Sequence, residues 1–303
     1  MQISVVIPTY NNAEGLHNAL HSILAAKAPE DAAYEVIVVD NNSSDYTKET
    51  VESVSPLFGG NIRYFCEPAQ GSSCARNRGI KEAKGEFLAF IDDDVQVDAL
   101  WLIEIVKNLR DRDVDCIAGR VLPKWEIQRP PWITDNLCKA LGLLDYGDTP
   151  FRIISLLHEF ITANCVIRRS IFNDEAYLFK TCLGHKGTNT QGGEDTEVFF
   201  SMMKGGHTVW YCPSCVVYHT IPRKRMLVRH FLKWNYQNSE SKVFLTRMFP
   251  GIYDGRELRR RMFKKAVDCL KRIDKSYIEL LGGLFFFAGL LYHNLLWHIR
   301  KRK

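Results

Sequence analysis

The chain has 303 residues, of which 46% are hydrophobic and 25% are charged, as is ordinary for a globular protein with a sizeable core. Its net charge of +5 is unevenly distributed, because residues 222–303 hold 20 Lys and Arg against 6 Asp and Glu. The preceding part of the chain is therefore acidic. The nine cysteines are odd in number and mostly lie in apolar runs, which argues against a disulfide framework and for reduced core residues.

No charged leader with an apolar core and a small-residue cleavage site precedes the first apolar run. We therefore expect that the chain is not secreted through a cleaved signal and that its amino-terminal region stays in the cytoplasm. Cys212 and Cys215 have the spacing of half a zinc site, but the sequence offers no second pair to complete it.

Three short apolar runs, rich in β-branched and aromatic residues, lie at residues 3–7, 35–39 and 87–91. Such continuous runs are typical of strands buried on both faces of a parallel sheet. Apolar residues recur at helical spacing between these runs, over residues 16–24 and 75–83. The alternation of strands and helices predicts a doubly wound α/β fold.

Polar residues follow the predicted strands where each strand ends, at residues 8–12, 40–45 and 92–94. Ligands of doubly wound sheets bind beyond the carboxyl ends of the strands, so we expect these residues to line a site. Turn formation and helix capping also favour Asn, Asp and Ser. Capping accounts for Asn12 and for Ser43 or Ser44, but it does not account for Asp40 followed by the acidic triplet.

The third run leads directly into Asp92, Asp93 and Asp94. In an extended strand, residues two apart share a face, so Asp92 and Asp94 are expected on one side and Asp93 on the other. Two carboxylates this close repel unless a cation lies between them, and Mg²⁺ or Mn²⁺ takes oxygen ligands together with phosphates. The alternative is a solvated acidic turn, in which Asp94 or Asp98 caps the following helix.

A second acidic cluster, at residues 194–197, opens a helical apolar run. Carboxylates are favoured in a first helical turn, so capping by Glu194 or Asp195 is one interpretation. The glycine-rich approach over residues 184–193 also allows close contact with a ligand, which would present Asp195 as a base.

Together these motifs resemble the family 2 glycosyltransferases, which are inverting enzymes with the nucleotide-sugar-binding GT-A fold. The resemblance covers roughly residues 3–220, and its ordered motifs are more specific than any one of them. They lie at residues 5–12, 38–45, 71–80, 92–94 and 193–195. The resemblance implies a mixed sheet flanked by helices and an enzyme that needs a divalent cation.

The resemblance also implies a role for each matching residue. Asp195, with Glu194 beside it, would be the catalytic base that accepts a proton from the acceptor hydroxyl. Asp94, Asp92 and His219 would hold Mg²⁺ or Mn²⁺, although a histidine that ends a strand is as often structural. The nucleotide sugar, most often a UDP-sugar in this family, would be bound by Pro8, Thr9, Tyr10, Asn11, Asp40, Ser43, Arg76, Asp92 and Asp93.

We expect a catalytic domain at residues 1–221 and a basic helical extension at residues 222–303. Within the extension, residues 277–297 approach the length that crosses a bilayer, but Glu279, His293 and Asn294 interrupt the apolar run. A monotopic or peripheral attachment to the cytoplasmic face of the membrane is favoured over a full span, and packing against the catalytic domain is the alternative. Nucleic acid is not expected as a partner, because no binding module accompanies the basic residues.

The sequence therefore favours an inverting enzyme that moves one sugar from a nucleotide sugar to a hydroxyl of a glycan or lipid-linked acceptor in cell-surface polysaccharide synthesis. A metal-dependent nucleotidyltransferase is an alternative, but residues 8–12 lack the glycine-rich basic loop expected there. A catalytically silent glycan- or lipid-binding module is another.

Overall fold

The computed structural model describes residues 1–155, 158–187, 189, 191–250 and 273–300. The chain forms two compact units. The first comprises residues 1–124, 142–182 and 194–220, and the second comprises residues 125–141, 183–193 and 221–303. The second unit thus takes in two internal segments beyond the expected extension, and the division at residue 221 stays a prediction.

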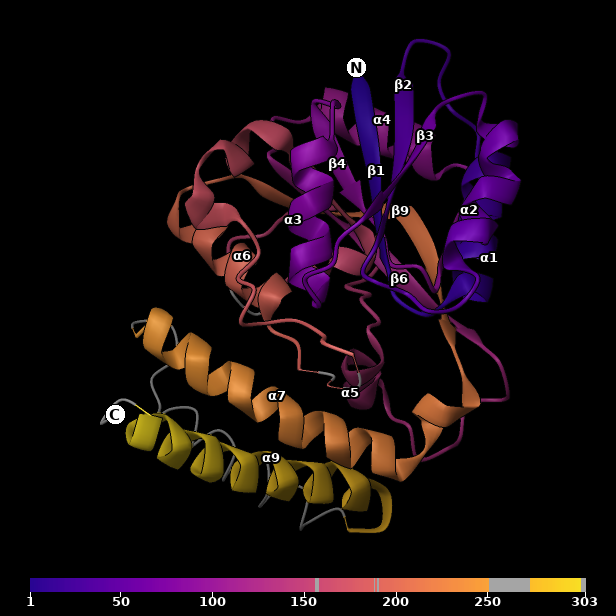
Figure 1. The fold of residues 1–303 in the computed structure, drawn as a ribbon. Coiled ribbons are helices and arrows are strands. Elements are labelled where there is room, and N and C mark those ends of the chain that lie inside the picture. The colour runs from indigo at the N-terminus through magenta and orange to yellow at the C-terminus, as the bar shows by residue number, and fades with distance from the viewer. Residues whose placement is uncertain (156–157, 188, 190, 251–272, 301–303) are drawn as a thin grey trace. The chain divides into compact units, whose positions relative to one another are not determined.

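A mixed sheet forms the first unit (Figure 1). Its strands are β1 (Gln2–Thr9), β2 (Ala33–Asp40), β3 (Ile62–Cys66), β4 (Phe87–Phe90), β5 (Val95–Val97), β6 (Cys116–Trp125), β7 (Phe151–Arg152), β8 (Cys165–Arg168) and β9 (Val209–Ile221). The order is β3-β2-β1-β4-β8-β6-β9-β5, with β7 beside β9. Strands β1 to β4 are mutually parallel, whereas β8 is antiparallel to β4 and β6. The three predicted strands and the α/β class are confirmed.

Helices cover this sheet. They are α1 (Ala13–Ala25), α2 (Thr47–Val54), α3 (Ser72–Glu82), α4 (Trp101–Asp111) and α6 (Glu194–Lys204), with short 3₁₀ turns η1 (Ser55–Phe58), η3 (Thr162–Asn164), η4 (Arg169–Asn173) and η5 (Glu175–Tyr177). Helix α1 buries Leu16 and Leu20 at the spacing read from the sequence. Helix α3 approaches β1 closely, because a Cβ at Gly79 would lie 2.3 Å from Val6 Cγ1. This contact packs the carboxyl-terminal part of α3 against the middle of β1.

The second unit contains α5 (Asp135–Cys138), η2 (Lys139–Leu141), η6 (Arg223–Met226), α7 (Val228–Met248) and α9 (Ile273–Arg300). Helices α7 and α9 lie side by side over much of their length (Figure 1). In the part of the chain that the structure describes, no helix combines the length and apolar character needed to cross a membrane.

Candidate active site

The acidic triplet lies at the carboxyl end of β4, but it is not extended. Strand β4 ends at Phe90, and the chain turns so that the Val95 amide donates to the Asp92 carbonyl at 3.3 Å. The strand alternation expected for Asp92 and Asp94 therefore does not apply. Each carboxylate instead has a different neighbour: Arg76 for Asp92, Asn12 for Asp93 and His219 for Asp94.

Arg76 joins the triplet to the second acidic cluster. Its guanidinium donates to Asp92 Oδ1 at 2.9 Å and to Glu194 Oε1 at 3.0 Å, and its side chain is only 6% exposed. Ser72 Oγ also donates to Glu194 Oε1, at 3.2 Å. Burial alone would lower the pKa of Arg76, but the charges of Asp92, Asp195 and Glu194 raise it further than burial lowers it. The two acidic clusters, far apart in sequence, therefore form one site.

Asp195 is the second residue of α6 and is held by η3. Thr162 donates to it twice, from its hydroxyl to Oδ1 at 2.8 Å and from its backbone amide to Oδ2 at 3.2 Å. Burial and the nearby charge of Glu194 raise the pKa of Asp195 to about 7, while Arg76 opposes this rise. A carboxylate with a pKa near neutrality is suited to accept a proton and hold it.

The pair Asp94 and His219 is the best placed to hold a divalent cation. Asp94 Oδ2 lies 3.1 Å from His219 Nε2. His219 Nδ1 lies 3.3 Å from the Gly142 carbonyl oxygen, which can only accept a hydrogen bond, so the ring is held between this carbonyl and Asp94. Neighbouring ligands of an octahedral Mg²⁺ with bonds of about 2.1 Å lie about 3.0 Å apart, so the pair fits such an ion.

The expected three-residue ligand set is not brought together, however. Across the described parts of the chain, no group of three or more His, Cys, Asp or Glu side chains is arranged to hold a metal. Asp92, the expected third ligand, is bound by Arg76 instead. Its guanidinium contact gives Asp92 a counter-charge without a metal ion.

The carboxyl ends of β1 and β2 lie next to each other in the sheet. Thr9 and Asp40 are register partners in the sheet, and both are buried. Asp40 already accepts two hydrogen bonds, from the Ser43 amide at 2.8 Å and from Tyr64 Oη at 2.6 Å. The Asn11 amide donates to Ser43 Oγ at 2.9 Å, which joins the two loops. The structure thus brings Thr9, Asn11, Asp40 and Ser43 together.

The loops place the remaining predicted residues differently. Asn12 makes no capping bond for α1, because its amide donates to Asp93 Oδ1 at 2.8 Å. Asn12 remains the N-cap residue, but Asp45 from the next loop accepts the hydrogen bond of the first helical amide, that of Ala13, at 3.0 Å. Tyr10 is 38% exposed beside Pro8, which is partly buried.

Sequence reasoning missed two supporting residues, Tyr64 and Thr162, and it placed Asn41 at the site without a role. Asn41 is buried and bonds the carbonyls of Glu67 and Ala69, while its own Oδ1 accepts from the Gly71 amide at 2.6 Å. It thereby fixes the loop before α3. Its position directly after Asp40 was a signal, but Tyr64 and Thr162 lie in segments whose sequence gave none.

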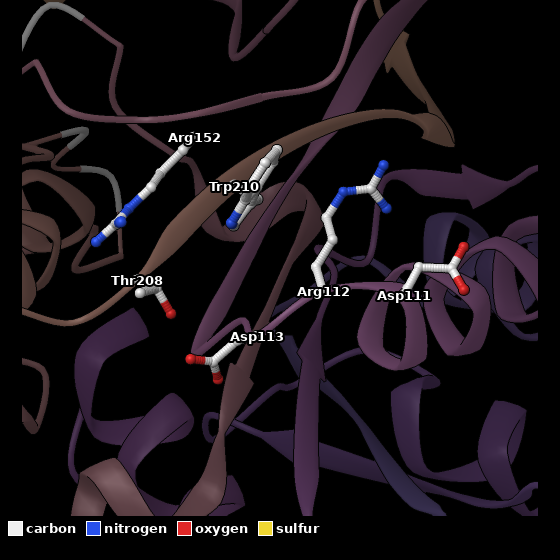
Figure 2. Close-up of a pocket in the computed structure, with 6 residues that line it drawn as sticks. All are labelled: Asp111, Arg112, Asp113, Arg152, Thr208 and Trp210. Atoms are coloured by element: carbon white, nitrogen blue, oxygen red, sulfur yellow. The ribbon is translucent and has the colours of Figure 1, made fainter.

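Figure 2 shows the residues that line a separate hollow, whose volume is about 510 Å³. It is lined by Asp111, Arg112, Asp113, Arg152, Thr208 and Trp210. The Arg112 guanidinium lies 5.3 Å from the centre of the Trp210 ring. Because Trp210 is the second residue of β9 and His219 lies near the end of that strand, the hollow is at the other end of β9 and is not the acidic site.

Comparison with known proteins identifies the family. The description "Glycosyl transferase family 2" matches residues 4–175, more than half of the chain. The chain belongs to glycosyl transferase family 2. This glycosyltransferase is 28% identical to the succinoglycan biosynthesis protein ExoM of Rhizobium meliloti over 242 residues, which cover 80% of this chain and 74% of ExoM. Family membership decides against the nucleotidyltransferase and the silent binding module.

Other relatives match shorter parts of the glycosyltransferase. The poly(ribitol-phosphate) β-N-acetylglucosaminyltransferase TarP of Staphylococcus aureus is 29% identical over 190 residues, 59% of this chain and 53% of TarP. A Campylobacter jejuni enzyme named GalNAc(5)-diNAcBac-PP-undecaprenol β-1,3-glucosyltransferase is 37% identical over 95 residues, 31% of this chain and 29% of that enzyme.

Solved structures confirm the GT-A fold. S. aureus TarS 1-349 in complex with UDP superposes with a TM-score of 0.55 at 17% identity, over 97% of this chain and 92% of that one. GalNAc-T7 with UDP, GalNAc and Mn²⁺ gives a TM-score of 0.56 at 20% identity, over 86% of this chain and 53% of that one. At these identities the likeness concerns the fold alone.

Proposed function

We propose that this glycosyltransferase moves one sugar, with inversion, from a UDP-sugar to a hydroxyl of a glycan or lipid-linked acceptor, with Mg²⁺ or Mn²⁺ as cofactor. The observation that carries the proposal is the Arg76 bridge, which joins the acidic triplet at the end of β4 to Glu194, the residue next to Asp195. A candidate base and a candidate diphosphate site thus belong to one cluster.

Each residue has one task in this proposal. Asp195 takes the proton of the acceptor hydroxyl, and the two bonds from Thr162 orient its carboxylate. Asp94 and His219 hold the divalent cation, which when bound supplies positive charge for the departing diphosphate. Arg76 lies between the clusters and adds a permanent positive charge to the same site. One base suffices for inversion, because the acceptor attacks the face opposite the leaving group.

The proposed nucleoside pocket lies at the ends of β1 and β2. Asp40 is preorganised by Ser43 and Tyr64, and each carboxylate oxygen keeps a lone pair for a donor from the base or ribose. Asn11, Pro8, Thr9 and Tyr10 would line the same loop edge, and Asp93 would act through its bond to Asn12.

The acceptor class is inferred from the relatives. ExoM is named for succinoglycan biosynthesis, and the C. jejuni enzyme is named for an undecaprenol-linked acceptor. These names, together with the basic carboxyl-terminal region, support work on a cell-surface polysaccharide or its lipid-linked precursor at the cytoplasmic face of a membrane.

Two variants test the division of tasks. Asp94→Ala should abolish Mn²⁺-dependent UDP binding in calorimetry, whereas Asp195→Asn should keep UDP affinity within about twofold and stop sugar transfer. Asp98→Ala is the matched control, because Asp98 accepts from the Leu100 amide and from Tyr218 and should leave both readouts unchanged. Equal loss of UDP affinity in the Asp94 and Asp195 variants would contradict the proposal.

A further inference from the structure

Helix α9 presents one face to α7 and the opposite face to solvent. Gly289 and Gly282 mark the inner face: a Cβ at Gly289 would lie 2.1 Å from Ser239 Oγ, and one at Gly282 would lie 2.9 Å from Asn235 Nδ2. His293 packs on the same side, with its ring centre 5.5 Å from that of Tyr236. Small residues thus let the two helices approach closely.

The outer face of α9 is apolar and exposed. Its large side chains are between 40% and 59% exposed, and they recur at helical spacing over two turns. They are Leu284, Phe285, Phe287 and Leu291, which we call the α9 outer face; Tyr292 lies at its margin, with its ring centre 6.4 Å from that of Tyr236 on α7. Contiguous aromatic and aliphatic side chains in water mark an interaction surface.

The composition around this face indicates the kind of partner. Residues 256–275, just before most of α9, contain nine Lys and Arg against three Asp and Glu, and the chain closes with Arg300 to Lys303. An apolar helical face between basic segments is suited to a bilayer with anionic headgroups. Helix α7 carries exposed Arg229 and Lys233, so lipid tails cannot surround the helix pair.

We propose that α9 lies in the plane of an anionic membrane surface, with the α9 outer face inserted among the lipids and α7 on the water side. This inference deepens the membrane part of the proposed function and does not depend on the sugar-transfer chemistry. In this arrangement the charged side chains of α7 keep α9 from entering the bilayer fully.

Vesicle flotation of the full chain tests this assignment. Wild-type protein should float with vesicles of phosphatidylcholine mixed with phosphatidylglycerol and far less with phosphatidylcholine alone. The double variant Leu284→Glu, Leu291→Glu should lower the partition coefficient by about tenfold or more, since each half-exposed leucine would otherwise be buried in lipid. Leu57→Glu is the matched control, because Leu57 is 62% exposed in the other unit and should float like wild type.

The possible outcomes are separable. Equal flotation of the double variant and wild type would overturn the proposal, as would equal flotation with both kinds of vesicle. A stable dimer in light scattering without lipid, lost in the double variant, would assign the face to a second copy and overturn it as well. UDP binding by the same variants checks that they fold. If wild-type protein did not bind UDP, the proposed function would be contradicted, but the lipid result would still stand.

Discussion

Replacing Arg76 by Gln should destabilise this glycosyltransferase far more than the same change at a neighbouring arginine. Arg76 donates to two carboxylates, and without it Asp92 and Glu194 lose their shared counter-charge beside Asp195. Arg78 lies two residues along α3 and forms one pair with Glu82 at 2.9 Å. Both substitutions replace an arginine of α3 by glutamine, and they differ in how deeply the arginine is buried.

The magnitudes follow from exposure. The side chains of Arg76 and Glu194 are 6% and 7% exposed, and removal of one partner from a buried pair costs about 3–5 kcal/mol because a charge is left unpaired. Asp92 is 32% exposed, which places the expected cost near the lower end, at about 3 kcal/mol. The Arg78 pair is partly exposed on both sides, so its loss should cost about 0.5 kcal/mol.

The cost should also depend on pH. Arg76 holds down the pKa of Asp195, so this pKa should rise above about 7 in the variant. In the unfolded chain an aspartate has a pKa of about 3.9, so between this pH and the folded pKa the unfolded chain binds fewer protons than the folded chain. This pH range is wider in the variant than in wild type. Stability therefore falls with rising pH, and above pH about 7 the variant should keep losing stability where wild type levels off.

Urea unfolding in EDTA at several pH values measures these differences. Equal midpoint shifts for the Arg76 and Arg78 variants at neutral pH would refute the reasoning, because burial would then not decide the cost. A variant that parallels wild type above pH 7 would refute the coupling between Arg76 and Asp195.

Three further outcomes follow from single contacts. Asp195→Asn should raise the free energy of unfolding, and this gain should be about 1–3 kcal/mol larger at pH 8 than at pH 5 when measured without metal. The reason is that the raised pKa of Asp195 means that folding disfavours its ionised form. A gain that does not change with pH would count against this. Burial would raise the pKa of Glu35, but hydrogen bonds led by that from Ser4 lower it, so its stabilisation is present above pH about 4.3 and lost as pH falls. Glu35→Gln should cost about 1–3 kcal/mol at neutral pH in urea unfolding and less in acid. Gly79→Ala should cost about 1–3 kcal/mol, since its Cβ would overlap Val6, and an unchanged melting temperature would show that α3 can shift.

Three of the four parallel strands could be read from the sequence, because they are buried on both faces and their apolar runs are continuous, whereas β3 is only partly buried and was not predicted. Residues 3–7 and 35–39 lie in β1 and β2 as expected. The antiparallel strands β6 and β8 could not be read in the same way. Their pairing depends on partners far away in the chain, and Cys165 meets Ala118 and Phe90 in a register that no local pattern encodes.

The site was predicted as a set of residues but not as a set of contacts. The residues of the site could be named because polar residues follow the strand ends, and the sheet topology alone brings these ends to one edge. The direction of each side chain depends on where a strand stops. The alternation argument for Asp92 and Asp94 failed because β4 ends two residues before the triplet, and turn geometry then replaces the strand period.

The turn explains how three adjacent carboxylates are tolerated at one strand end. Like charges in a row repel, and burial together with the charge of Asp94 raises the pKa of Asp93 to about 7. Each carboxylate meets a different neighbour from a different element, however: Arg76 on α3, Asn12 before α1 and His219 near the end of β9. A strand would have pointed two of the three the same way, whereas the turn distributes them. The triplet therefore ties together three elements of the sheet edge, and any substitution in it should disturb the positions of the other site residues as well as the charge.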